Sequence, residues 1–143
     1  MRYLNKIVFI NSAAIRYSEV QLDGNIHLIG TQGVGKSTIL RAILFFYNAD
    51  TQRLGIPVEK KSYQDYYFPY ADSSIIYEVA REDGWFTVLS YKTMNRICYR
   101  FIASPYRPDL FIDEEGAPYP SDRIRSVLDK NGIKSVSYTH LTL

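Results

Sequence analysis

The sequence has few of the residues that build disulfide frameworks and metal centres. Cys98 is the only cysteine among 143 residues, which excludes an internal disulfide and a zinc site made of thiolates. The two histidines, His27 and His140, are far apart, and no second ligand lies at metal spacing from either of them. The apolar neighbours of Cys98 predict that it is a small buried strand residue and not a nucleophile.

Long apolar runs and an excess of one charge are also missing. No stretch approaches the ~20 apolar residues of a membrane-spanning helix, and the amino terminus lacks the small-residue cleavage site of a signal peptide. The net charge of +2 is too small to indicate nucleic-acid binding by itself. We therefore expect no membrane partner and, most simply, a cytoplasmic location. The length and the 46% hydrophobic content indicate one compact domain.

The first third of the chain predicts three strands followed by a helix. The strands are residues 4–10, 16–22 and 25–29, with a hairpin turn signal at Asp23-Gly24. Residues 37–47 have the length of a helix and are apolar nearly all round, which predicts a helix buried on most of its circumference.

The remainder predicts a loop, an antiparallel meander and a last helix. Residues 51–72 resemble a loop, and three strands follow at 74–81, 85–92 and 96–103, separated by turn signals. One face of the third strand carries Ile97, Tyr99 and Phe101. A short strand is expected at 110–112 before a turn at 114–116. A helix is expected from Ser121, its cap, to Asn131, with Gly132 as its stop and an apolar stripe of Ile124, Val127 and Leu128.

Residues 30–37, GTQGVGKS, fit the phosphate-loop pattern G-x-x-x-x-G-K-[ST]. The motif follows a predicted strand and opens a predicted helix, as this kind of loop requires. The pattern therefore predicts a site for the phosphates of a purine nucleoside triphosphate. The expected nucleotide-binding residues are Gly30, Thr31, Gln32, Gly33, Val34, Gly35, Lys36, Ser37 and Thr38.

Each residue type in this loop has a physical role. Glycine allows positive φ and a close approach of the backbone N–H groups to phosphate oxygen, and the helix that follows adds the positive end of its dipole. Lys36 is expected to reach the β- and γ-phosphates. The Ser37 hydroxyl is a hard oxygen ligand for Mg²⁺, and Thr38 can donate to the α-phosphate.

The residues that would complete a hydrolase are harder to find. Hydrolysis needs an acidic residue after a second apolar strand and a group that orients water. The candidates are Asp113 and Glu114, but their apolar run is three residues long, so a solvated turn is the better interpretation. Residues 113–116 also fit the D-x-x-G of GTPases, yet no N-K-x-D signature follows. We assign no catalytic residue from the sequence.

The order of these elements resembles the amino-terminal half of an ATPase head of the SMC family. That order is a strand at the amino terminus, a hairpin, the phosphate loop and then an antiparallel meander. The relatives of this family include DNA-repair and Wadjet-type plasmid-defence ATPases. The resemblance implies an α/β fold, the amino-terminal lobe of an ABC/SMC-head-like P-loop NTPase, with a mixed sheet and a buried P-loop helix. It also implies that ATP and Mg²⁺ are ligands and that DNA is a substrate. A coiled coil is expected to follow this lobe, and the expected partners are the carboxyl-terminal half of the same head and a second head.

The match with the SMC family has departures. Gln32 stands where many relatives have Asn. The glutamine that senses magnesium in the SMC family has no clear counterpart here, although Gln64 is a candidate. Arg53 roughly matches the arginine that some relatives place near phosphate or DNA, but a solvated charge in a loop is the better interpretation.

The last nine residues, 135–143, continue no earlier pattern and resemble a translated adapter sequence. We therefore expect a lobe over residues 1–134 and a non-native or disordered tail over 135–143, the alternative being a short terminal strand.

Two other functions remain open at this point. The chain can be a self-contained small P-loop NTPase or kinase that uses Asp113, or a nucleotide-responsive interaction module without catalysis. The topology distinguishes a self-contained enzyme from half of an SMC-like head. A kinase or GTPase core alternates strands and helices to build a parallel sheet, whereas residues 74–103 predict consecutive antiparallel strands.

Overall fold

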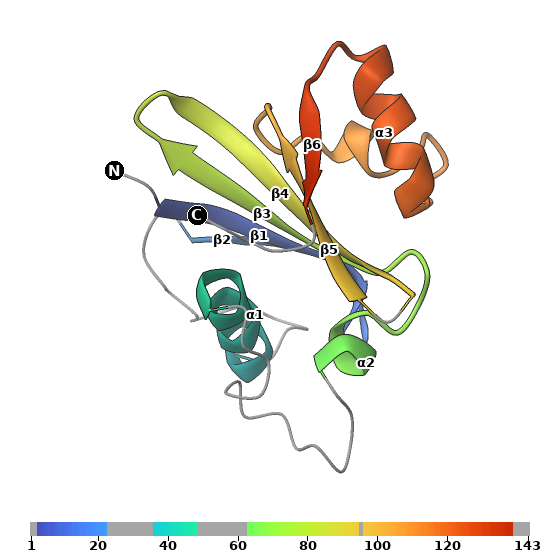
Figure 1. Ribbon diagram of the computed structural model, residues 1–143. Helices are drawn as coiled ribbons and strands as arrows, with labels where there is room; N and C mark the ends of the chain where they lie inside the picture. Colours follow the sequence, from blue (N-terminus) through green and yellow to red (C-terminus); the bar gives the residue numbers. More distant parts are fainter. Residues whose placement is uncertain (1–2, 23–35, 49–62, 95, 139–143) are drawn as a thin grey trace.

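The computed structural model describes residues 3–22, 36–48, 63–94 and 96–138. These residues form an α/β structure around one six-stranded sheet (Figure 1), in the order β2-β1-β3-β4-β5-β6. Every pair of neighbouring strands is antiparallel. The strands are β1 (Tyr3–Ser12), β2 (Ile15–Gln21), β3 (Ser74–Arg81), β4 (Gly84–Thr93), β5 (Arg96–Ile102) and β6 (Ser135–Tyr138).

The predicted mixed sheet is therefore wrong for the strands described. The predicted strand at residues 25–29, with His27, lies outside the described residues, as does the turn at Asp23-Gly24. The hairpin that is described joins β1 to β2 through Ala13 and Ala14, which both have positive φ values (50° and 64°).

The meander of β3, β4 and β5 confirms the prediction almost to the residue. Alternating residues and short turns specify it, because a slip of one position would exchange its two faces. Ile97 and Tyr99 are buried on one face with Phe101 packed against them, as expected. Cys98 is partly buried in β5.

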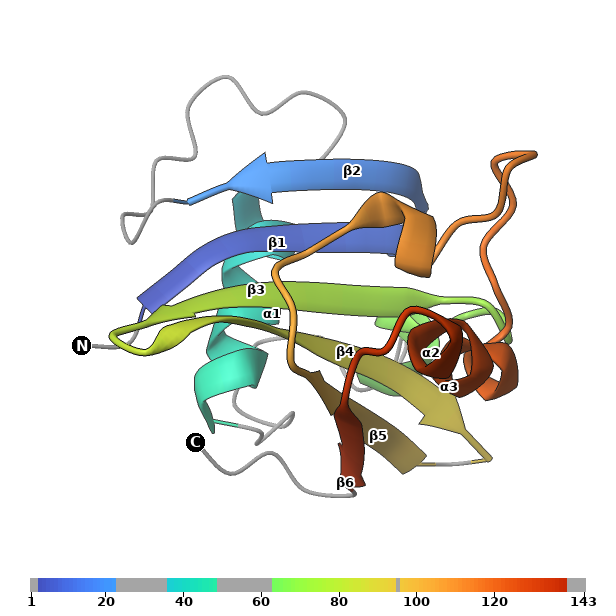
Figure 2. The same ribbon diagram turned by 90° about the horizontal axis from the view of Figure 1, so that it is seen from above.

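The sheet is covered on both faces, which gives the molecule three layers (Figure 1). One core lies under α1 (Lys36–Asn48) and α2 (Tyr63–Tyr67) and contains Ile39, Phe46 and Tyr67 with sheet residues such as Tyr77. The other core lies under the 3-10 helix η2 (Pro108–Leu110) and α3 (Ser121–Lys130). Viewed from above, β2 lies at one edge of the sheet and β5 and β6 at the other (Figure 2).

Helix α1 is less completely buried than its composition predicted. Ile39, Ala42 and Ile43 are almost fully buried against the sheet, but Leu40 and Leu44 are 41% and 37% exposed. Residues four apart lie on one face of a helix, so these two leucines form an exposed apolar strip that faces away from the sheet.

Two predictions about the second half need correction. The expected strand at 110–112 is not formed; Pro108 begins a 3-10 turn, and the Ile112 N–H donates back to the Pro108 carbonyl at 2.9 Å. A single bridge between Ile112 and Pro118 then closes the turn.

Helix α3 begins where predicted, but its N-cap is Pro120 and not Ser121, and the cap makes no side-chain hydrogen bond. Gly132 follows the helix with φ of 68°, as a glycine stop requires. Ile124 and Leu128 are buried, with Val127 packed against them, which confirms the predicted stripe.

Residues 135–138 of the predicted tail form β6 on the edge of β5, the alternative noted from the sequence. Residues 139–143 lie outside the described part, and a non-native origin of the tail stays a prediction. Among the described helices, none is both long and apolar enough to cross a membrane.

Candidate nucleotide site at the start of α1

The predicted site residues divide between described and undescribed parts of the chain. Residues 30–35 lie outside the described residues, as does Arg53. Lys36, Ser37 and Thr38 are the first three residues of α1. A helix that opens at the lysine of the motif is the arrangement that a phosphate loop needs, because the N–H groups of its first turn have no partner within the helix.

Ser37 and Thr38 have opposite surroundings. Ser37 is exposed, so its hydroxyl is accessible to a hydrated cation, which fits a role as one oxygen ligand for Mg²⁺. Thr38 is 9% exposed, and its Oγ1 lies 3.2 Å from the Tyr66 hydroxyl. The Tyr67 hydroxyl also donates to the Thr38 carbonyl at 2.7 Å. The first turn of α1 is thus held through Thr38.

Helix α2, which makes these contacts, was missed in a segment predicted as a loop. It is only five residues long, and although it carries no Gly or Pro, residues 58–68 as a whole lack both, so the composition gave no signal that located the helix. Gln64 lies in this helix. Tyr66 and Tyr67 were not singled out from the sequence, because their partner Thr38 is 28 and 29 positions away.

The body of α1 is fixed to the sheet by a tyrosine on the central strand β3. The Tyr77 hydroxyl donates to the Ala42 carbonyl at 3.0 Å, and the ring of Tyr77 packs on Phe46 with centroids 4.5 Å apart. Burial of the Tyr67 hydroxyl raises its pKa above the ordinary value of 10.0, so the donor to the Thr38 carbonyl stays protonated well into the alkaline range. Helix α1 is therefore attached by hydrogen bonds at Thr38 in its first turn and at Ala42 in its middle.

Asp113 is not brought to the start of α1. Its Oδ1 accepts hydrogen bonds from the N–H groups of Glu115 and Ala117, both at 2.9 Å, so the carboxylate closes its own turn. Its neighbour Ile112 packs on the core under η2 and α3, on the face of the sheet opposite α1. Glu114 is exposed in the same turn.

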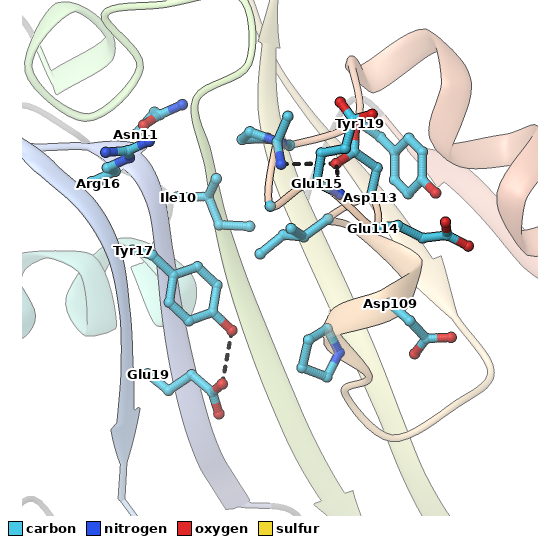
Figure 3. Close-up of a pocket in the computed structure, with 15 residues that line it drawn as sticks. Ile10, Asn11, Arg16, Tyr17, Glu19, Asp109, Asp113, Glu114, Glu115 and Tyr119 are labelled. Atoms are coloured by element: carbon cyan, nitrogen blue, oxygen red, sulfur yellow. Dashed lines mark hydrogen bonds between the residues drawn. The ribbon is translucent and has the colours of Figure 1, made fainter.

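An open groove of about 1190 Å³ lies between this turn and the β1–β2 hairpin (Figure 3). On the hairpin side, the Tyr17 hydroxyl donates to Glu19 at 2.7 Å and lies 2.7 Å from the Tyr106 hydroxyl. Since Tyr17 gives its proton to the carboxylate, Tyr106 must donate to Tyr17. Glu19 in turn pairs with Lys6 at 3.2 Å.

This chain of groups ties the 106–119 segment to the sheet edge. The pKa of Tyr17 is raised to about 12, first by burial; the hydrogen bond from Tyr106 lowers it, and the hydrogen bond to Glu19 and the charge of that carboxylate raise it. Nothing in the groove resembles a catalytic arrangement. Within residues 3–22, 36–48, 63–94 and 96–138, no three acidic, His or Cys side chains are grouped to hold a metal ion.

The described residues form an α/β structure whose sheet is covered on both faces, with a candidate phosphate-binding helix, α1, on one of them. A family model described as a protein of unknown function, DUF3584, matches residues 11–141. The chain belongs to this family. No curated protein and no solved structure gives a significant match.

Proposed function

We propose that the chain binds ATP with Mg²⁺ through residues 30–38, as the amino-terminal lobe of an SMC-like ATPase head that acts on DNA. The observation that carries the proposal is the position of Lys36 and Ser37, the last two residues of the motif, at the opening of a long helix that packs on a sheet. The motif predicts a helix at this position, and α1 begins there.

The surroundings of α1 support a site built for an anion. No acidic residue occupies the first turn of the helix, so no carboxylate of that turn repels phosphate or competes with it for the helix dipole. Ser37 is open to a metal ion, and Thr38 is held by two tyrosines. In this proposal Lys36 neutralises phosphate, Ser37 holds Mg²⁺, and Mg²⁺ shields the charge between the β- and γ-phosphates.

The exposed strip on α1 supports the expectation of further partners. Leu40 and Leu44 present apolar surface on the side of the helix that faces away from the sheet. An apolar strip on a helix favours a covering element. In the proposed head, that element is the carboxyl-terminal half, which would also bring the acidic residue that polarises water.

A self-contained P-loop enzyme that uses Asp113 is the competing function. Two observations weigh against it. The Asp113 carboxylate already accepts two backbone hydrogen bonds in its own turn. The described sheet is also antiparallel throughout, unlike the parallel sheet of a kinase or GTPase.

A turnover assay on the purified chain with Mg-ATP separates the two functions. The proposed half-head binds ATP but hydrolyses it no faster than buffer, because groups from other chain segments must stabilise the developing charge. Robust hydrolysis that is lost in Asp113→Asn would overturn this proposal in favour of the self-contained enzyme. Glu115→Gln, an exposed carboxylate in the same turn that was not a catalytic candidate, is the matched control.

A further inference from the structure

Helix α2 is attached to the sheet independently of α1. The Tyr66 carbonyl accepts a hydrogen bond from the N–H of Ala13, in the β1–β2 turn, at 3.2 Å. Asp65 lies 3.9 Å from the ammonium of Lys92 on β4. The ring of Tyr67 is fully buried and stands edge-on to Tyr66, with centroids 4.8 Å apart. The Tyr66 hydroxyl is therefore held in a defined place whether or not α1 has a ligand.

The contact between Tyr66 and Thr38 leaves one hydroxyl proton for a further bond. The two hydroxyls, 3.2 Å apart, carry two protons between them, and the bond that joins them uses one. If Tyr66 donates, the Thr38 proton remains; if Thr38 donates, the Tyr66 proton remains. An anion beside the pair favours the arrangement that directs the remaining proton toward it.

The Thr38 main chain cannot adjust easily. Its carbonyl accepts the Tyr67 hydroxyl at 2.7 Å, and its side chain is 9% exposed. With the backbone fixed and its oxygen joined to the Tyr66 hydroxyl, as donor or as acceptor, the hydroxyl of Thr38 has few orientations left. A donor that is oriented before binding loses less entropy when the ligand arrives.

We infer that Tyr66 is a positioning residue of the nucleotide site: it holds the Thr38 hydroxyl so that the remaining proton of the pair is donated to a phosphate oxygen. The inference rests on the function proposed above. It assigns to α2, a helix outside the motif, a share in the affinity for triphosphate.

The test is a double-mutant cycle on the whole chain, read by titration calorimetry with Mg-ATP. Tyr66→Phe keeps the ring and removes the hydroxyl, and we expect it to weaken ATP binding about tenfold. Thr38→Val is expected to weaken binding at least as much. The double variant should bind no more weakly than Thr38→Val alone, because the two hydroxyls act as one unit.

The melting temperature without nucleotide separates positioning from a merely structural role. We expect Tyr66→Phe to leave it nearly unchanged while reducing the rise that ATP produces. Tyr67→Phe is the matched control: it removes a buried bond to the Thr38 carbonyl and should lower the melting temperature itself. Equal ATP affinity in Tyr66→Phe and the unaltered chain, or additive losses in the double variant, would overturn the inference and leave the proposed function standing. If the unaltered chain binds no ATP, the proposed function itself fails.

Discussion

The side-chain amide of Asn5 on β1 donates to the buried carboxylate of Glu78 on β3 at 2.6 Å. The second oxygen of that carboxylate accepts the backbone N–H of Tyr106 at 2.7 Å. Glu78 is 6% exposed. One buried acid therefore joins two neighbouring strands to the segment that leads into η2.

Replacement of Glu78 should be strongly destabilising. Glu78→Ala leaves two buried N–H donors without an acceptor, so we expect the free energy of unfolding to fall by about 3 kcal/mol. Urea denaturation followed by circular dichroism measures this. Glu114→Ala, at an exposed turn position, is the control and should change the value by less than about 0.5 kcal/mol. A loss for Glu78→Ala as small as that of the control would contradict the role assigned to this acid.

Alkaline pH should weaken the fold through Tyr17. Its pKa is raised from 10.0 to about 12 in the folded chain, first by burial. The folded state holds this proton more tightly, so the stabilisation is complete below pH 10 and is lost as the pH rises through 12. Urea midpoints across this range should fall less steeply in Tyr17→Phe.

The slope will not vanish in that variant, since burial also raises the pKa of Tyr67, Tyr99 and Tyr106. Tyr70→Phe, at a position that is 65% exposed, is the control and should keep the original slope. A Tyr17→Phe profile that matches the control would show that the Tyr17 proton is not linked to folding.

The leucine strip on α1 should drive self-association of the purified chain. Leu40→Glu with Leu44→Glu replaces exposed apolar surface by charge, so we expect a shift toward monomer in sedimentation velocity. Stability should change by less than about 1 kcal/mol, because neither side chain belongs to the core. The control is the double variant Ser126→Glu with Lys130→Gln on α3, which has the same spacing and the same change in net charge as the leucine variant. If this pair produces an equal shift toward monomer, the leucine strip is not the contact surface.

Much of this architecture could be predicted from residues near one another in sequence. The meander followed from alternating apolar residues and short turns, and the start of α1 followed from the phosphate-loop motif. Both depend on local pattern. The exposed strip of α1 could not be predicted, because a helix that is apolar all round does not show which face meets the sheet.

Contacts between distant residues explain the other differences. The sequence indicated neither that Thr38 would meet Tyr66 nor that Glu78 would be buried with Asn5, 73 positions away. The strand predicted at 110–112 failed because Pro108 starts a local turn that uses the N–H of Ile112.

Magnesium dependence tests the role of Ser37. Because its hydroxyl is proposed to bind the metal and not phosphate, Ser37→Ala should weaken ATP binding at least about tenfold in Mg²⁺ and much less in EDTA. Nucleotide affinity measured by calorimetry in the two conditions gives the comparison, with Ser126→Ala on α3 as the control. Equal losses with and without the metal would make Ser37 a purely structural residue.

The most direct measurement is a calorimetric titration of Mg-ATP into the unaltered chain and into Lys36→Ala, with Lys130→Ala on α3 as the charge-matched control. We expect saturable binding by the unaltered chain and by the control. We expect no detectable binding by Lys36→Ala, with a circular dichroism spectrum and melting temperature like those of the unaltered chain. Unchanged Mg-ATP affinity in Lys36→Ala would contradict the assignment of residues 30–38 as the phosphate site.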